Sequence, residues 1–113
     1  MRLAPSFEEV SPTFGRNFAF GLTTCASWSV HTGKGPVELT APGAAPILVI
    51  GTSRDPATPL AWAESLASTL SSAVLVRRDG DGHTGYGSGN DCVDDVVEKY
   101  LVSGDVPDGD VDC

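Results

Sequence analysis

The sequence predicts an α/β fold, a βαβα unit with parallel strands in an incomplete sheet. Two continuous apolar runs, 47–50 and 73–76, are typical of strands that are buried on both faces of a parallel sheet. Helical patterns of apolar residues occupy the chain between the two runs and the chain after the second run. Strands that alternate with helices in this way favour parallel pairing through right-handed crossovers.

Length and charge restrict the class of protein. With 113 residues, of which 41% are hydrophobic, the chain is long enough for one small domain. A net charge of −8 argues against a nucleic-acid partner, because phosphate binding needs clustered Lys and Arg side chains. No apolar run approaches the ~20 residues that span a bilayer, and the first residues lack the apolar core of a signal peptide. We therefore expect no nucleic-acid partner and no membrane partner.

The N-terminal part carries weak signals for regular structure. Residues 1–45 show no sustained period, and His31 is most simply an exposed loop residue. Prolines at 42 and 46 bracket a turn-rich approach to the first strand. The chain is therefore divided into an irregular segment, 1–45, and an α/β unit, 46–113.

A loop with Ser53 and Asp55 is expected after the first apolar run. Gly51 and Ser53 resemble the start of Gly-x-Ser-x-Gly, the motif that carries a nucleophilic serine in a strand-to-helix turn. Asp55 stands where the second glycine is needed, and its β-carbon would crowd that turn. Ser53 is therefore interpreted as a loop residue. Thr58 is predicted to cap the next helix, with Pro59 as its first residue.

Two helices are predicted from apolar spacing. The first carries a stripe at Ala63, Leu66, Ala67 and Leu70 and ends near Ser71 and Ser72. The second begins from a cap at Asn90 or Asp91 and stops at Gly104, and its apolar positions are Val93, Val96, Val97, Tyr100 and Leu101. Between the second strand and the second helix, the loop 79–89 is too rich in glycine to be an ordinary connector, and it contains His83.

Three cysteines, Cys25, Cys92 and Cys113, fit no zinc-ligand spacing, and no cofactor is predicted. A cysteine that closes a polar, turn-forming tail is better explained by a disulfide than by core packing, and a disulfide indicates an exported protein. Pairing of Cys92 with Cys113 would tie the tail to the last helix, whereas pairing of Cys25 with Cys92 would staple the N-terminal segment. The first pairing is favoured, and it leaves Cys25 to pair with a group outside this chain.

Asp55 and His83 follow the C-terminal ends of the two predicted strands. Parallel neighbours place these ends about 5 Å apart, on the edge where ligands bind in open α/β folds. A carboxylate that accepts a hydrogen bond from Nδ1–H leaves Nε2 free to take a proton from a serine. The pair has the types and the order of the last two members of a Ser-Asp-His triad, with the serine expected upstream. The plainer alternative is that Asp55 caps a turn and His83 is a solvated loop residue.

Several short motifs in a fixed order carry a resemblance to a known family. They are Cys25 with Trp28, Pro46 to Gly51 with Asp55 to Pro59, Asp79 to His83, Ser88 with Cys92 and Val93, and Tyr100 and Leu101 with Gly104, Pro107, Gly109 and Cys113. On these residues the segment from Cys25 to Cys113 is similar to the C-terminal domain of the TAP-like α/β-hydrolases, which are exported tripeptidyl aminopeptidases and related carboxylesterases or proteases. The resemblance implies that Asp55 is the triad acid and His83 the general base of a secreted serine hydrolase with a peptide or ester substrate.

The resemblance also implies that the chain is a fragment or a truncated reading frame. A full member of the family carries the early strands, the oxyanion-hole loop, the serine elbow and a helical lid before this segment. The nucleophilic serine is therefore not expected in this chain, and the isolated chain is expected to be inactive. Its apolar faces would lack partners, so we expect marginal stability or self-association through the open sheet edge.

Two other functions stay open at this stage. The chain could be a non-catalytic extracellular module that binds calcium through aspartate-rich loops at 79–81 and 105–112, although neither run completes the twelve-residue calcium pattern with a closing glutamate. It could also be a structural or regulatory protein that keeps the C-terminal hydrolase fold without chemistry.

Overall fold

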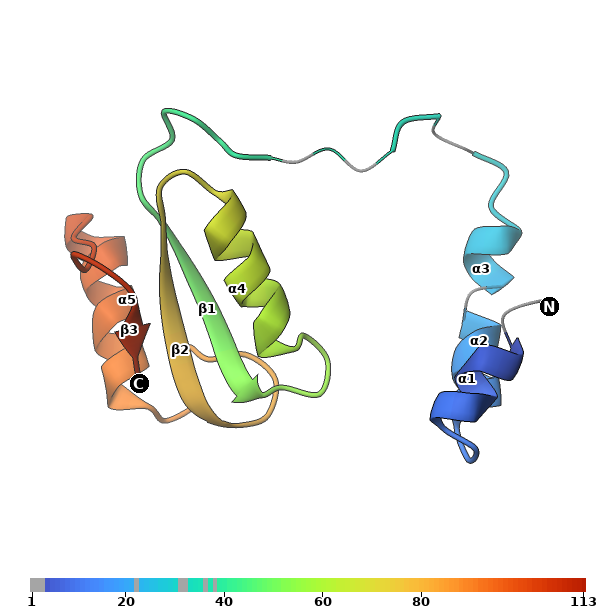
Figure 1. Cartoon of the computed structure of the whole chain (residues 1–113). Coiled ribbons are helices and arrows are strands. Elements are labelled where there is room, and N and C mark those ends of the chain that lie inside the picture. The colour runs from blue at the N-terminus through green and yellow to red at the C-terminus, as the bar shows by residue number, and fades with distance from the viewer. Residues whose placement is uncertain (1–3, 22, 31–32, 36, 38) are drawn as a thin grey trace. The chain divides into compact units, whose positions relative to one another are not determined.

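A computed structural model of the chain describes residues 4–21, 23–30, 33–35, 37 and 39–113, with Cys25 described by its backbone alone. The prediction for His31 lies outside the described residues. Contacts divide the chain into two compact units, Met1–Pro36 and Val37–Cys113 (Figure 1).

The first unit is helical where the structure describes it. It contains α1 (Ala4–Val10), α2 (Gly15–Gly21) and α3 (Thr23–Ala26). The segment expected to be irregular thus carries short helices, each too short to show a sustained apolar period. Gly15 lies directly against the backbone of α1, because a β-carbon there would approach the Phe7 carbonyl oxygen to 2.0 Å.

The second unit is built on a parallel sheet. Its strands are β1 (Ile47–Arg54), β2 (Ala73–Asp81) and β3 (Val111–Asp112), in the order β1-β2-β3 and parallel throughout. The predicted α/β class with parallel strands in an open sheet is confirmed. Both long strands extend beyond the apolar runs, because their polar ends continue to pair as far as Arg54 and Asp81. Ser53 therefore lies within β1, and its prediction as a loop residue is wrong.

One helix covers each face of the sheet. The crossover helix α4 (Leu60–Thr69) packs where Gly51 leaves room for Leu60 and Ala63. The other face packs against α5 (Asp91–Ser103), and Val76, Val93 and Val97 form the buried cluster there (Figure 1). The packing of α4 is looser, because Trp62 is 64% exposed and Leu66 is 50% exposed.

The helix ends confirm one predicted cap and correct another. Asn90 caps α5 by accepting the Val93 N–H at 3.1 Å, and Gly104 ends that helix at φ 74°. By contrast, α4 begins at Leu60 without a side-chain cap, and the Thr58 hydroxyl binds Asp55 instead. Leu101, which was predicted on the apolar face of α5, is 67% exposed.

The C-terminal tail is fixed by covalent and backbone contacts. The predicted disulfide between Cys92 and Cys113 is present. The Cys113 N–H donates to the Arg77 carbonyl at 2.7 Å, and the Asn90 amide donates to the Cys113 carbonyl at 3.0 Å. These contacts add β3 to a tail that was predicted to be only turn-forming. Among the described residues, no helix is long and apolar enough to cross a membrane.

Candidate active site

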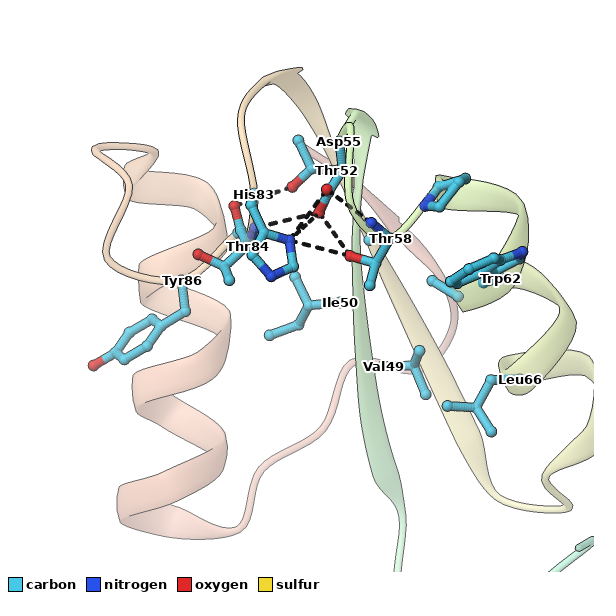
Figure 2. A pocket seen from close by; sticks show the side chains of 14 residues that line it. Val49, Ile50, Thr52, Asp55, Thr58, Trp62, Leu66, His83, Thr84 and Tyr86 are labelled. Carbon is cyan, nitrogen blue, oxygen red and sulfur yellow. Dashed lines mark hydrogen bonds and ion pairs between the residues drawn. The ribbon is translucent and has the colours of Figure 1, made fainter. Parts of the chain in front are cut away.

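The ends of the two long strands bring Asp55 and His83 into contact. Asp55 directly follows β1, His83 lies two residues beyond β2, and Arg54 pairs with Asp81 across the ladder. His83 Nδ1 lies 2.8 Å from Asp55 Oδ2 and 3.1 Å from Asp55 Oδ1 (Figure 2). The parallel topology therefore places the two side chains together, as the sequence predicted.

Asp55 is buried and accepts several hydrogen bonds. The residue is 8% exposed. Its Oδ1 accepts the N–H groups of Ala57 at 2.8 Å and Thr58 at 2.9 Å. Its Oδ2 accepts the Thr58 hydroxyl at 2.8 Å and the Thr84 N–H at 3.3 Å. Asp55 thus caps a turn and contacts His83 at the same time, so the turn-capping alternative does not exclude the pair.

These contacts keep the Asp55 carboxyl ionised. Burial acts to raise its pKa, but the Thr58 N–H, His83, the Ala57 N–H and the Thr58 hydroxyl together outweigh burial and hold the pKa well below its usual range. An ionised carboxylate only accepts hydrogen bonds, so the proton between the two side chains belongs to Nδ1. In a neutral imidazole, a proton on Nδ1 leaves Nε2 as an acceptor.

A cavity adjoins the pair. It has a volume of about 610 Å³ and is lined by His83 together with apolar side chains that include Ile50, Trp62, Leu66 and Tyr86 (Figure 2). The His83 side chain is 54% exposed, whereas that of Asp55 is 3% exposed. The His83 ring thus contacts the buried Asp55 carboxylate through Nδ1, and it also lines the cavity.

The serines near the site are engaged elsewhere. The Ser53 hydroxyl donates to Asp79 Oδ1 at 2.8 Å and accepts the Gly80 N–H at 3.1 Å. The Ser88 hydroxyl donates to the Gly85 carbonyl. Neither serine is hydrogen-bonded to His83, whose Nδ1 contacts Asp55 and the Thr58 hydroxyl instead.

Four of the six aspartates considered for calcium are found in ion pairs. Arg54 contacts Asp79 at 2.8 Å and Asp81 at 2.7 Å. Arg77 likewise contacts Asp110 at 3.1 Å and Asp112 at 3.3 Å. Within the described residues, no three His, Cys, Asp or Glu side chains are grouped so that they could hold a metal ion. The structure therefore offers no observation in favour of the calcium alternative.

The threonines around the pair were not predicted as part of the site. Thr58 was interpreted as a helix cap, although the spacing from Asp55 to Thr58 is typical of a turn in which an aspartate accepts backbone N–H groups two and three residues ahead. That spacing was an available signal. Thr52 and Thr84, which are hydrogen-bonded to each other at 3.2 Å, left no such signal.

Comparison with known proteins identifies relatives. A family model described as TAP-like protein matches residues 11–113. The chain is 38% identical over 92 residues to serine protease Hip1 of Mycobacterium tuberculosis, covering 81% of this chain and 18% of Hip1. It is 37% identical over 89 residues to carboxylesterase B of the same species, covering 79% of this chain and 17% of that protein. It is 34% identical over 91 residues to tripeptidyl aminopeptidase of Streptomyces coelicolor, covering 79% of this chain and 17% of that protein.

The chain spans less than a fifth of the length of these relatives, at 17% to 18%. Its α/β architecture with an open parallel sheet is consistent with part of an α/β-hydrolase fold. The family model covers nearly the whole sequence, which establishes the family. The chain therefore belongs to the TAP-like family of α/β-hydrolases and is related to the C-terminal region of its serine hydrolases.

Proposed function

We propose that this chain supplies the acid and the general base of a serine hydrolase. Asp55 is the triad acid and His83 is the base, and the nucleophilic serine comes from polypeptide outside these 113 residues. The observation that carries the proposal is the 2.8 Å contact between His83 Nδ1 and a buried Asp55 carboxylate. The contact leaves Nε2 for the nucleophile.

The geometry supports a defined order of proton movements. His83 Nε2 takes the proton of the serine hydroxyl as the serine oxygen bonds to the carbonyl carbon of the substrate. The imidazolium then gives this proton to the departing amine or alcohol, and water releases the acyl group by the same route. Asp55 stays ionised throughout because its hydrogen bonds hold its pKa low, and its charge stabilises the imidazolium.

The substrate class follows from the relatives. They are named as a serine protease, a carboxylesterase and a tripeptidyl aminopeptidase, so the proposed substrate is a peptide or an ester. All three names describe the transfer of an acyl group to water, and one acid and base pair can catalyse each of these reactions. The disulfide between Cys92 and Cys113 supports an exported enzyme, because disulfides persist in oxidising compartments.

A chimera tests the proposal. This chain would replace the matching C-terminal segment of M. tuberculosis Hip1, and hydrolysis of a p-nitrophenyl ester would be followed. His83→Gln should lower kcat roughly 10³-fold or more, because the general base is lost. Asp108→Asn, at an exposed tail position, is the control and should leave kcat unchanged.

Two outcomes would contradict the proposal. One is a chimera that hydrolyses the ester equally well with His83→Gln and with the control. The other is a folded chimera, judged by circular dichroism, that hydrolyses no ester. The chain by itself should resist labelling by a fluorophosphonate probe, and labelling at Ser53 or Ser88 would overturn the placement of the nucleophile elsewhere.

A further inference from the structure

The loop that carries His83 is tied to β1 by a buried threonine. Thr52 lies in β1 and is 2% exposed, and its hydroxyl donates to the Thr84 carbonyl at 3.2 Å. Thr84 directly follows His83, and its N–H donates to Asp55 Oδ2 at 3.3 Å. Both polar groups of the Thr84 backbone are therefore held by residues at the end of β1.

Thr84 has an unusual backbone conformation. Its φ is 73°, in the left-handed region that a β-branched residue rarely adopts. Such a conformation persists only where the surroundings impose it, and it is found disproportionately at functional sites. Thr84 makes two backbone hydrogen bonds in this conformation, one through its N–H and one through its carbonyl.

The loop also lies directly on the strand. Gly85 is buried, and a β-carbon there would come within 2.6 Å of Ile50 Cγ2. The chain from His83 to Gly85 thus crosses β1 at a separation that leaves no room for a side chain at position 85. Figure 2 shows Thr52, Thr84 and Ile50 gathered beside the imidazole.

We infer that Thr52 is a positioning residue, which holds His83 in register with Asp55 through the Thr84 backbone. Without the Thr52 hydroxyl, the Thr84 carbonyl loses its buried donor, and the residue can relax to a negative φ. That rotation moves the Thr84 N–H away from Asp55 and turns the adjoining His83 peptide. The inference rests on the proposed function, because it explains how the proposed acid and base pair is aligned.

The test uses the 113-residue chain labelled with ¹⁵N. Its readouts are the ring ¹⁵N shifts of His83, which report the tautomer, and the hydrogen-exchange rate of the Thr84 amide. Thr52→Val keeps the side-chain shape and removes the hydroxyl. We expect roughly three- to tenfold faster exchange of the Thr84 amide, the loss that one hydrogen bond corresponds to, and ring shifts of a mixed tautomer.

Matched variants separate positioning from general stability. Thr52→Ser keeps a hydroxyl and should restore both readouts. Thr69→Val removes a hydroxyl that donates within α4, to the Ser65 carbonyl at 2.9 Å, and should change neither. Unchanged readouts in Thr52→Val would overturn the inference.

Two further measurements separate a failure of the Asp55–His83 pair from a failure of the role inferred for Thr52. Asp55→Asn should shift the His83 ring signals, and a failure to do so would count against the proposed Asp55–His83 pair and not against Thr52. If Thr52→Val does not fold, a measurement of the Thr84 backbone in the unsubstituted chain still tests the inference. A strong intraresidue nuclear Overhauser effect between HN and Hα of Thr84 would support the positive φ that the inference requires, and a weak one would overturn it.

Discussion

Two carboxylates lie at the same end of the sheet and behave differently. Asp55 has a side chain that is 3% exposed, accepts backbone N–H groups and contacts an imidazole. Asp79 has a side chain that is 78% exposed and pairs with Arg54. The pKa of Asp79 is also lowered, first by the Ser53 hydroxyl and then by Arg54, yet solvent screens these contacts. Burial with backbone donors, and not charge alone, distinguishes the candidate catalytic acid from its neighbour.

The largest expected difference between the two carboxylates is in catalysis. In the Hip1 chimera, Asp55→Asn should lower kcat about 10³- to 10⁴-fold, because the amide no longer holds Nδ1–H and no longer stabilises the imidazolium. Asp79→Asn makes the same chemical change at the exposed position and should alter kcat less than about twofold. Steady-state ester hydrolysis measures both. Equal losses in the two variants would remove the distinction.

A second difference is between the covalently fixed tail and the hydrogen-bonded site. Replacing both Cys92 and Cys113 by serine should lower the free energy of unfolding by about 3 kcal/mol, since the bridge closes a loop with a sequence separation of 21. The ring ¹⁵N shifts of His83 should stay unchanged, because the disulfide has no contact with the pair. Urea unfolding and NMR of the same sample test this. A tautomer change at His83 would show that the tail and the site are coupled.

The smallest expected effect concerns the exposed ion pairs of Arg54. Arg54→Gln should lower the melting temperature by no more than about 5 °C in low salt. The difference from the unsubstituted chain should become smaller at about 1 M NaCl, because salt weakens the attraction between exposed charges. Thermal melts at two salt concentrations measure it. A loss of melting temperature that is equally large in high salt would place Arg54 among the structural supports of the site.

The sequence predicted the contact between Asp55 and His83 because topology and pattern agree there. The apolar runs locate both strands, and parallel pairing through a helix brings together the residues that follow them. The proximity of Asp55 and His83 could therefore be predicted from the sequence alone. Thr58 was wrongly predicted because a threonine before a proline is typical of a helix cap, whereas Asp55 provides a stronger acceptor for its hydroxyl. Local propensity was overridden by a neighbouring charge.

Other features had no local signal. The strand β3 has only two residues, Val111 and Asp112, and depends on pairing with β2 and on the disulfide next to it. The Thr84 backbone at φ 73° depends on hydrogen bonds to Thr52 and Asp55, which lie 32 and 29 residues away in the sequence. Contacts of that kind are set by the assembled fold and not by any short motif.

The most direct measurement of the central claim is the ring ¹⁵N spectrum of His83 at neutral pH. We predict that, in the neutral imidazole, the proton lies on Nδ1, held by Asp55, and that Nε2 is unprotonated and ready to accept a proton. A His83 that carries its proton on Nε2, or that exchanges freely between both tautomers as a solvated imidazole does, would contradict it.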